Sequence, residues 1–320
     1  MSAAEGGRAP LDPADVDLAV DLCGLRMPTP VMTASGCAAA GRELDQFFDV
    51  TSIGAVVTKS IMRSPRSGRP TPRMVETPSG MLNSIGLQGP GIDAFLARDL
   101  PWLVQRGARA FVSIAGETAD EYVELARRVG QAPGVAGIEV NISCPNVENR
   151  GMVFACDPDS SYRVLSEVRP HIPDDIPVFA KLTPDVTDIT IVAGAAADAG
   201  ADGVTVINTL LGIAMDPDTL RPRLGGVTGG LSGPAVRPVA VRAVWQIRRA
   251  LPDLPIIGVG GIRTGFDALE MVLAGAAAVQ VGTVIFHDPS APVRVADELR
   301  DELAVRGFAS LDEVRGLAHV

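Results

Sequence analysis

Short runs of almost continuous apolar residues recur along the chain and alternate with longer stretches of helical character. Eight of these runs, rich in Val, Ile and Ala, are predicted as strands: residues 30–35, 55–60, 110–116, 137–143, 177–183, 203–209, 255–261 and 278–283. Helices are predicted between them over residues 118–129, 160–168, 187–199, 234–250 and 264–274. Strands without polar alternation are typical of a parallel sheet buried on both faces. The pattern therefore predicts an α/β fold, a (β/α)8 TIM barrel, with a doubly wound sheet as the alternative.

Three connections are too long for ordinary turns after a strand: residues 60–90, 143–160 and 208–233. We expect them to be irregular insertions at the C-terminal face of the strands, where barrel enzymes place their chemistry. The chain shows no internal repeat or linker that would separate a second domain. The predicted organisation is a polar N-terminal extension over residues 1–15 and a single barrel domain over residues 16–320.

Composition narrows the possible partners. The 320 residues carry a net charge of −10, and 47% of them are apolar. The acidic balance argues against a nucleic-acid surface, which needs clustered basic residues. Four widely spaced cysteines form neither a disulfide framework nor a metal site. The polar start lacks a signal peptide, and no apolar stretch is long enough to cross a membrane. We therefore expect a cytoplasmic protein without metal, membrane or nucleic-acid partners.

Lysine and asparagine are rare, and their positions are informative. Only two of the 28 basic residues are lysines, Lys59 and Lys181, and each lies near the end of an apolar run. An ammonium there suits an anionic ligand or an electron-rich ring edge, although a chance surface lysine is the plain alternative. The five asparagines lie at strand ends or in the long loops: Asn83, Asn141, Asn146, Asn149 and Asn208. Amides suit a planar ligand with amide edges.

Cys144, in the segment NISCPN, follows the fourth predicted strand, where a thiol could act as a general base or a nucleophile. The other three cysteines are expected to be inert and buried: Cys23, Cys37 and Cys156. The three histidines lie outside these motifs, which argues against a Cys–His pair or a zinc site.

Glycines end the last two predicted strands. Gly260 and Gly261 end the seventh, and Gly282 and Thr283 end the eighth. Backbone N–H groups at these positions can hold a phosphate, which is a recurring site in such barrels. The residues alone thus predict a phosphate-bearing ligand near two lysines, several amides and one thiol.

These motifs together resemble the dihydroorotate dehydrogenase family. The matching segments are TASG at Ser35, VVTKS at Lys59, MLNSIGLQGPG at Asn83, NISCPN at Cys144, AKLTP at Lys181, INTLLG at Asn208, TGGLSGPA at Gly233, GVGGI at Gly260 and VGT at Gly282. The resemblance runs from about Val16 to the last helices. It implies an FMN-binding (β/α)8 barrel that oxidises dihydroorotate to orotate in pyrimidine biosynthesis.

The resemblance implies a role for each motif. Cys144 would remove the C5 proton of dihydroorotate while a hydride passes from C6 to flavin N5, and Lys59 would contact both flavin and substrate. The implied substrate-binding residues are Lys59, Asn83, Ser84, Ile85, Gly86, Leu87, Asn141, Asn146, Asn208 and Thr209. The implied FMN-binding residues are Ser35, Lys59, Ser60, Ser113, Asn141, Lys181, Ile207, Gly233, Gly260, Gly261, Gly282 and Thr283. Lys181 would stabilise the reduced flavin at its N1–C2 edge.

The subclass follows from the same motifs. A cysteine at position 144 is similar to the soluble class 1 enzymes, since the membrane-bound class 2 enzymes carry serine. MLNSIGLQGPG and TGGLSGPA look most like class 1B, a catalytic FMN subunit paired with a reductase subunit that carries FAD and a 2Fe-2S cluster and passes electrons to NAD. Fumarate is the alternative acceptor, and a homodimer core is expected. One departure is Ser113, which stands where the family usually has Asn and reaches less far.

Two other functions remain open at this stage. Another FMN barrel, such as a dihydropyrimidine or dihydrouridine reductase, would share the glycines and Lys181 but not the MLNSIGLQ and NISCPN pair. A non-catalytic FMN- or phosphate-binding subunit would bind FMN without turning over dihydroorotate, and Cys144 would then be structural.

Overall fold

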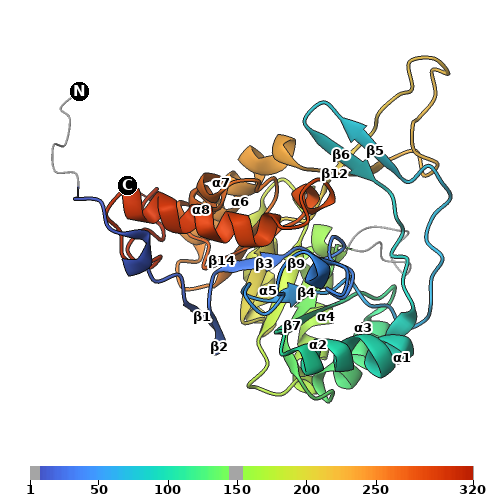
Figure 1. Ribbon diagram of the computed structural model, residues 1–320. Helices are drawn as coiled ribbons and strands as arrows, with labels where there is room; N and C mark the ends of the chain where they lie inside the picture. The colour runs from blue at the N-terminus through green and yellow to red at the C-terminus, as the bar shows by residue number, and fades with distance from the viewer. Residues whose placement is uncertain (1–7, 144–153, 320) are drawn as a thin grey trace.

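Eight parallel strands form the centre of the molecule. The computed structural model describes residues 8–143 and 154–319. The strands are β3 (Val31–Thr33), β4 (Val56–Val57), β7 (Ala110–Ile114), β8 (Val135–Val140), β9 (Val178–Leu182), β10 (Gly203–Val206), β13 (Ile256–Val259) and β14 (Ala278–Val281). Their order is β3-β14-β13-β10-β9-β8-β7-β4. Thr33 N–H donates to Ala55 O and Gly54 N–H to Val31 O, which brings the first and last strands together. The predicted barrel is confirmed (Figure 1).

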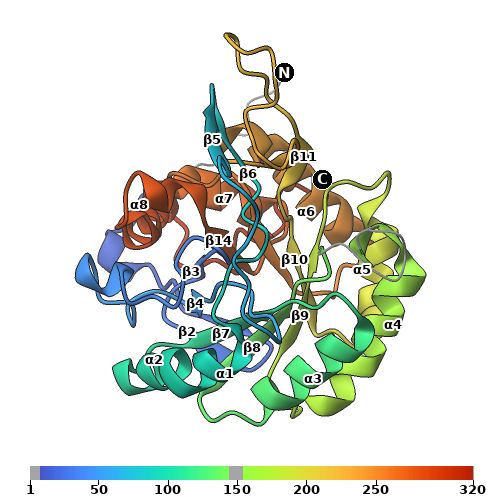
Figure 2. The same cartoon turned by 90° about the vertical axis from the view of Figure 1, so that its right-hand side faces the viewer.

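Helices surround this barrel and cover the outer faces of the strands (Figures 1 and 2). They are α1 (Gly91–Ala94), the π-helical η3 (Phe95–Asp99), α2 (Leu100–Arg106), α3 (Ala119–Gly130), α4 (Pro158–Val168), α5 (Ile189–Asp198), α6 (Arg237–Ala250), α7 (Gly265–Leu273) and α8 (Ala291–Val305). Short 3-10 turns are η1 (Pro13–Asp15), η2 (Leu44–Gln46), η4 (Phe154–Cys156), η5 (Arg169–His171), η6 (Pro234–Val236) and η7 (Thr283–Phe286). The five predicted helices are present; the helical segment from α1 to α2, and α8, were not among them.

Side-chain caps explain where several helices begin. The Thr118 hydroxyl accepts a hydrogen bond from Glu121 N–H at the start of α3. Thr264 and Asp267 form a reciprocal capping box at the start of α7. Such caps satisfy N–H groups that have no partner within the helix. They also set where each turn from strand to helix ends, and these turns carry the predicted glycine motifs.

The connections over residues 60–90 and 208–233 form regular strands, which corrects the expectation of irregular loops there. They contribute β5 (Met74–Thr77), β6 (Gly80–Asn83), β11 (Leu210–Gly212) and β12 (Gly229–Ser232), an antiparallel sheet in the order β11-β12-β6-β5. Gly230 pairs with Asn83, and Leu231 with Leu82. Because both connections follow C-terminal ends of barrel strands, the sheet lies at that end of the barrel (Figure 2). These strands have only three or four residues, and three of the four contain glycine, so no local pattern revealed a pairing between segments about 150 residues apart.

The N-terminal part of the described chain packs against the barrel. A hairpin of β1 (Val20–Leu22) and β2 (Leu25–Met27) precedes β3. Leu11 N–H donates to Ala304 O at 2.9 Å, and the Arg8 guanidinium lies over the Phe308 ring. The described residues of the predicted extension therefore contact α8 and the segment that follows it.

Candidate active site

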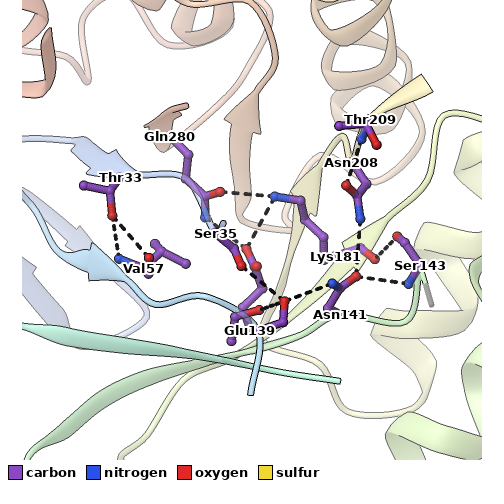
Figure 3. A network of polar contacts seen from close by, with 12 residues as sticks. Thr33, Ser35, Val57, Glu139, Asn141, Ser143, Lys181, Asn208, Thr209 and Gln280 are labelled. Carbon is purple, nitrogen blue, oxygen red and sulfur yellow. Dashed lines mark hydrogen bonds and ion pairs between the residues drawn. The ribbon is translucent and has the colours of Figure 1, made fainter. Parts of the chain in front are cut away.

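Polar side chains from several strand ends form one connected network at the C-terminal mouth of the barrel (Figure 3). Asn141 follows β8 directly, and its amide nitrogen donates to Ser60 Oγ at 3.1 Å. The Asn141 amide oxygen accepts from Asn208 Nδ2 at 3.3 Å. Ser60 Oγ also lies 3.2 Å from Ser35 Oγ and 3.0 Å from Ser113 Oγ. The structure therefore brings five of the predicted side chains together within hydrogen-bonding distance.

Lys181 lies on β9 with only 7% of its side chain exposed. Its ammonium nitrogen is 3.2 Å from Gln280 Oε1 and 3.7 Å from Glu139 Oε2. Gln280 Nε2 donates to the same Glu139 oxygen at 3.0 Å. A buried charge is costly unless it is paired and hydrogen-bonded, and these two partners supply both.

Lys59 follows β4 and is half-buried, and its N–H donates to Ala39 O at 2.8 Å. A Cβ on Gly36 would lie 3.9 Å from Lys59 Cδ. Cys37 is the next residue, and it is close enough for the charges of both lysines to affect the pKa of its thiol. Burial raises the pKa of the Cys37 thiol to about 11, and the positive charges of Lys181 and Lys59 oppose that rise. The two lysines of the chain therefore belong to one electrostatic neighbourhood.

The antiparallel sheet positions several residues that were predicted to bind the substrate. Asn83, at the end of β6, donates from Nδ2 to Gly230 O at 3.3 Å. Thr209 N–H donates to Asn208 Oδ1. A Cβ added to Gly230 would lie only 2.0 Å from the Thr209 hydroxyl oxygen. Ser84 is buried, and its hydroxyl has no hydrogen-bond partner among the described residues. A buried hydroxyl of this kind is available to a bound ligand.

The remaining residues of the MLNSIGLQ segment pack nearby. Ile85 O accepts a hydrogen bond from Arg69 N–H at 2.9 Å. A Cβ on Gly86 would lie 2.8 Å from Arg69 Cγ. Leu87 adopts a φ of 55° and packs against Met62 and Ala115. This conformation is uncommon for a residue with a side chain, and such strain is concentrated at binding loops.

The glycine motifs converge at the last two barrel strands. Gly233 and Gly261 have φ values of 92° and 74°, and a Cβ on Gly261 would lie 2.8 Å from Gly233 O. A Cβ on Gly260 would lie 2.8 Å from Ala240 Cβ and 3.7 Å from Ile207 Cγ1. Thr283 Oγ1 donates to Ser232 Oγ at 2.8 Å, beside Gly233. Backbone therefore lines this end of the site, because side chains do not fit there.

Some expectations need correction or fall elsewhere. Cys23 is exposed in the turn between β1 and β2, and Cys37 and Cys156 are partly buried, so the cysteines are less buried than expected. Cys144, Asn146 and Asn149 lie outside the described residues. Sequence reasoning missed Glu139 and Gln280, although each is a polar residue within an apolar strand run, a signal that could have found them.

Two absences hold within residues 8–143 and 154–319. No group of three or more His, Cys, Asp or Glu side chains is arranged to hold a metal ion there. In the same ranges every helix is too short or too polar to span a bilayer.

Comparisons with known proteins agree with the motifs. The family model for dihydroorotate dehydrogenase matches residues 17–303. The chain is 50% identical over 304 residues to a Geobacter sulfurreducens protein named dihydroorotate dehydrogenase B (NAD(+)), catalytic subunit, covering 95% of this chain and 99% of that protein. A Desulforudis audaxviator protein of the same name is 49% identical, with 95% and 98% covered. The chain therefore belongs to the dihydroorotate dehydrogenase family.

Proposed function

We propose that this chain is the FMN-binding catalytic subunit of an NAD-linked dihydroorotate dehydrogenase of class 1B. The observation that carries the proposal is the identity of about half of all positions, over nearly the full length, to relatives of that name. The connected network of Asn141, Ser60 and Asn208 at the barrel mouth supports it. These residues offer donors and acceptors to a planar, imide-bearing ring such as orotate.

The residues present fit the flavin that the family uses. The close backbone at Gly233, Gly260 and Gly261, with Gly282 and Thr283, provides a cradle for a phosphate. At the other end Lys181 supplies a buried positive charge for the ring. FMN, when bound, supplies the acceptor for the hydride that leaves C6 of the substrate.

The side chains of this chain would bind and orient the substrate. Asn83, Asn141, Asn208 and Thr209 would hold the amide edges and the carboxylate of the ring, and Lys59 would contact ring and flavin together. The hydroxyls of Ser35, Ser60 and Ser113 form a chain that fixes the Asn141 amide. An amide held in this way presents its donor and acceptor in defined directions, which favours one orientation of the ring.

Cys144 is the proposed base. Its thiolate would take the proton from C5 of the substrate, forming an S–H bond as the C5–H bond breaks. An ordinary cysteine has a pKa of about 8.5, so the thiolate fraction rises with pH in this range. We therefore expect flavin reduction by dihydroorotate to accelerate as the pH rises through the Cys144 pKa.

The name of the relatives, a catalytic subunit, indicates a separate partner subunit. We infer that this partner carries FAD and a 2Fe-2S cluster and delivers electrons to NAD, around a homodimer of this chain in the cytoplasm. The described cysteines do not cluster as cluster ligands would. Residues 16–320 are proposed as one domain.

An anaerobic mixture of purified FMN-loaded chain and dihydroorotate tests the proposal. Loss of the visible flavin absorption is the expected result, and it should be faster at pH 9 than at pH 7. A yellow protein that stays yellow would reject the dehydrogenase activity. A rate that is flat from pH 6 to 10, together with a fully active Cys144→Ser variant, would reject Cys144 as the base.

A further inference from the structure

Glu139 is a fully buried carboxylate inside the barrel, and sequence reasoning gave it no role. It lies on β8 with 0% of its surface exposed. Glu139 Oε2 accepts from Gln280 of β14, which is separated from β8 by β13, β10 and β9 in the sheet order. A bond between strands so far apart must cross the interior of the barrel, as Figure 3 shows. The carboxylate therefore sits in the lumen beneath the candidate active site.

The same arrangement holds Lys181 from two sides. Its ammonium contacts Gln280 Oε1 at 3.2 Å and faces Glu139 Oε2 at 3.7 Å. An ammonium has three N–H donors, so these two partners leave a third donor for a ligand. Because Gln280 is itself bonded to Glu139, the three side chains form a closed triangle that fixes the position of the ammonium.

The triangle is not an efficient way to stabilise a barrel core. Glu139 Oε1 has no hydrogen-bond partner among the described residues, nor does the buried hydroxyl of Thr205, which pairs in register with Lys181. Unsatisfied buried polar atoms cost stability, and a buried ion pair is often no better than apolar residues of similar size. Both features therefore point to a role other than packing.

We propose that Glu139 is a positioning residue that holds the Lys181 ammonium and partly neutralises its charge, and thereby sets how strongly bound FMN favours its reduced form. The inference rests on the proposed function, because it needs the flavin ring beside Lys181. Removing the carboxylate charge leaves the ammonium uncompensated, and a more positive environment favours electron uptake by a flavin.

The test is the midpoint potential of the FMN-loaded chain, measured at fixed pH by reductive titration with a reference dye. Glu139→Gln keeps the size of the side chain and should raise the potential. We expect about a tenfold shift toward reduced flavin, or ~30 mV for a two-electron couple. Glu302→Gln removes one charge from an exposed ion pair on α8 and should leave the potential unchanged.

The same substitution made in a chain that lacks the Lys181 ammonium tests whether Glu139 acts through Lys181. In a Lys181→Gln chain, Glu139→Gln should shift the potential much less, because the ammonium through which Glu139 is proposed to act is absent. If Glu139→Gln does not fold, Glu139→Asp withdraws the carboxylate by one methylene and should give a smaller rise. An unchanged or lower potential in the position-139 variant that folds, or equal shifts in both backgrounds, would overturn the proposal.

The titration uses no dihydroorotate, so its result is separable from the proposed activity. A chain that fails to oxidise dihydroorotate but shows the expected shift would keep the role of Glu139 and reject the substrate. A chain that oxidises dihydroorotate but shows no shift would keep the activity and reject the role of Glu139.

Discussion

The two ends of the candidate site are built on different principles. Around β4, β7, β8 and β10 the site consists of side chains that bond to one another, with Asn141 at the centre. Around β13 and β14 it consists of backbone, with glycines packed closely against α6. The first end recognises a ring by the direction of its donors and acceptors. The second accommodates a compact anion through close approach of the main chain.

The difference predicts how each end responds to substitution. At the side-chain end, a conservative change alters one partner in a network and should give a graded effect. At the backbone end, a Cβ on Gly260 or Gly261 would lie 2.8 Å or 2.7 Å from a Cβ atom of α6, so even alanine is a large change there. The following experiments are ordered from the largest expected effect to the smallest.

The largest effect is expected from Cys144→Ser, the substitution of the proposed base. Loss of a general base reduces the rate by about 10²- to 10⁴-fold, and we expect flavin reduction by dihydroorotate to slow accordingly. Binding of FMN should be unchanged, because the change removes chemistry and not the cradle. Stopped-flow absorbance measures the rate. A variant that loses FMN instead would contradict a role of Cys144 confined to proton removal.

Gly261→Ala probes the backbone end. The residue has a φ of 74°, and the new Cβ would lie 2.7 Å from Arg237 Cβ and 2.8 Å from Gly233 O. The combined strain of ~2–3 kcal/mol should weaken FMN binding by roughly 30- to 150-fold. Fluorescence titration of the apoprotein measures the affinity.

Gly194→Ala on α5 is the matched control, since nothing lies within 4 Å of its added Cβ. It should leave FMN affinity unchanged and stabilise the helix by up to ~1 kcal/mol. Equal losses of affinity in both alanine variants would contradict the assignment of the cradle to Gly261.

Cys37 lies between the two ends, and its thiol makes stability depend on pH. Burial raises its pKa to about 11 from 9.0, against the opposing charges of Lys181 and Lys59. The unfolded chain releases this proton near pH 9, whereas the folded chain keeps it to about pH 11. Stability is therefore unaffected below pH 9 and falls by up to ~2 kcal/mol as the pH rises toward 11.

Urea unfolding at pH 8 and pH 10.5 measures this loss. Cys37→Ala should show a smaller loss between the two values than the unmodified chain does. If both chains lose the same stability, the alkaline sensitivity arises elsewhere, for example at Cys23, where partial desolvation of the thiol and the negative charges of Asp202 and Asp21 also raise the pKa to about 11.

The smallest effect is expected from Ser113→Asn, which restores the residue that the family usually has. Ser113 Oγ bonds to Ser60, and a longer amide would reach further toward the ligand. One additional hydrogen bond of ~0.5–1.5 kcal/mol should tighten FMN or orotate binding by roughly two- to tenfold. Isothermal titration measures it, with Ser113→Ala as a control that should weaken binding. Weaker binding of the Asn variant would show that the buried network has no room for it.

Much of the barrel could be predicted from local pattern. All eight apolar runs became strands, because a strand buried on both faces needs apolar residues wherever it runs. The antiparallel sheet of β5, β6, β11 and β12 could not be predicted in this way. Its strands are short and irregular in pattern, and its stability depends on pairing between residues such as Leu82 and Leu231.

The same distinction between local pattern and long-range pairing applies to the candidate site. The rarity of lysine and asparagine pointed to Lys181, Asn141 and Asn208, and the family resemblance added the serines of the same network, Ser35, Ser60 and Ser113. The residues that these side chains contact could not be predicted from the sequence. The contact of Lys181 with Gln280 spans 99 residues, and that of Gln280 with Glu139 spans 141.

The sequence by itself thus determined the strands, the fold class, the family and the residue types of the site, because periodicity and motifs are local properties of the chain. The tertiary structure alone decided which buried charge faces which, and that two long connections form one sheet. The physical reason is closure of the barrel. It places side chains from distant strands in one low-dielectric interior, where the free energy of each charge depends on the partners that the fold supplies.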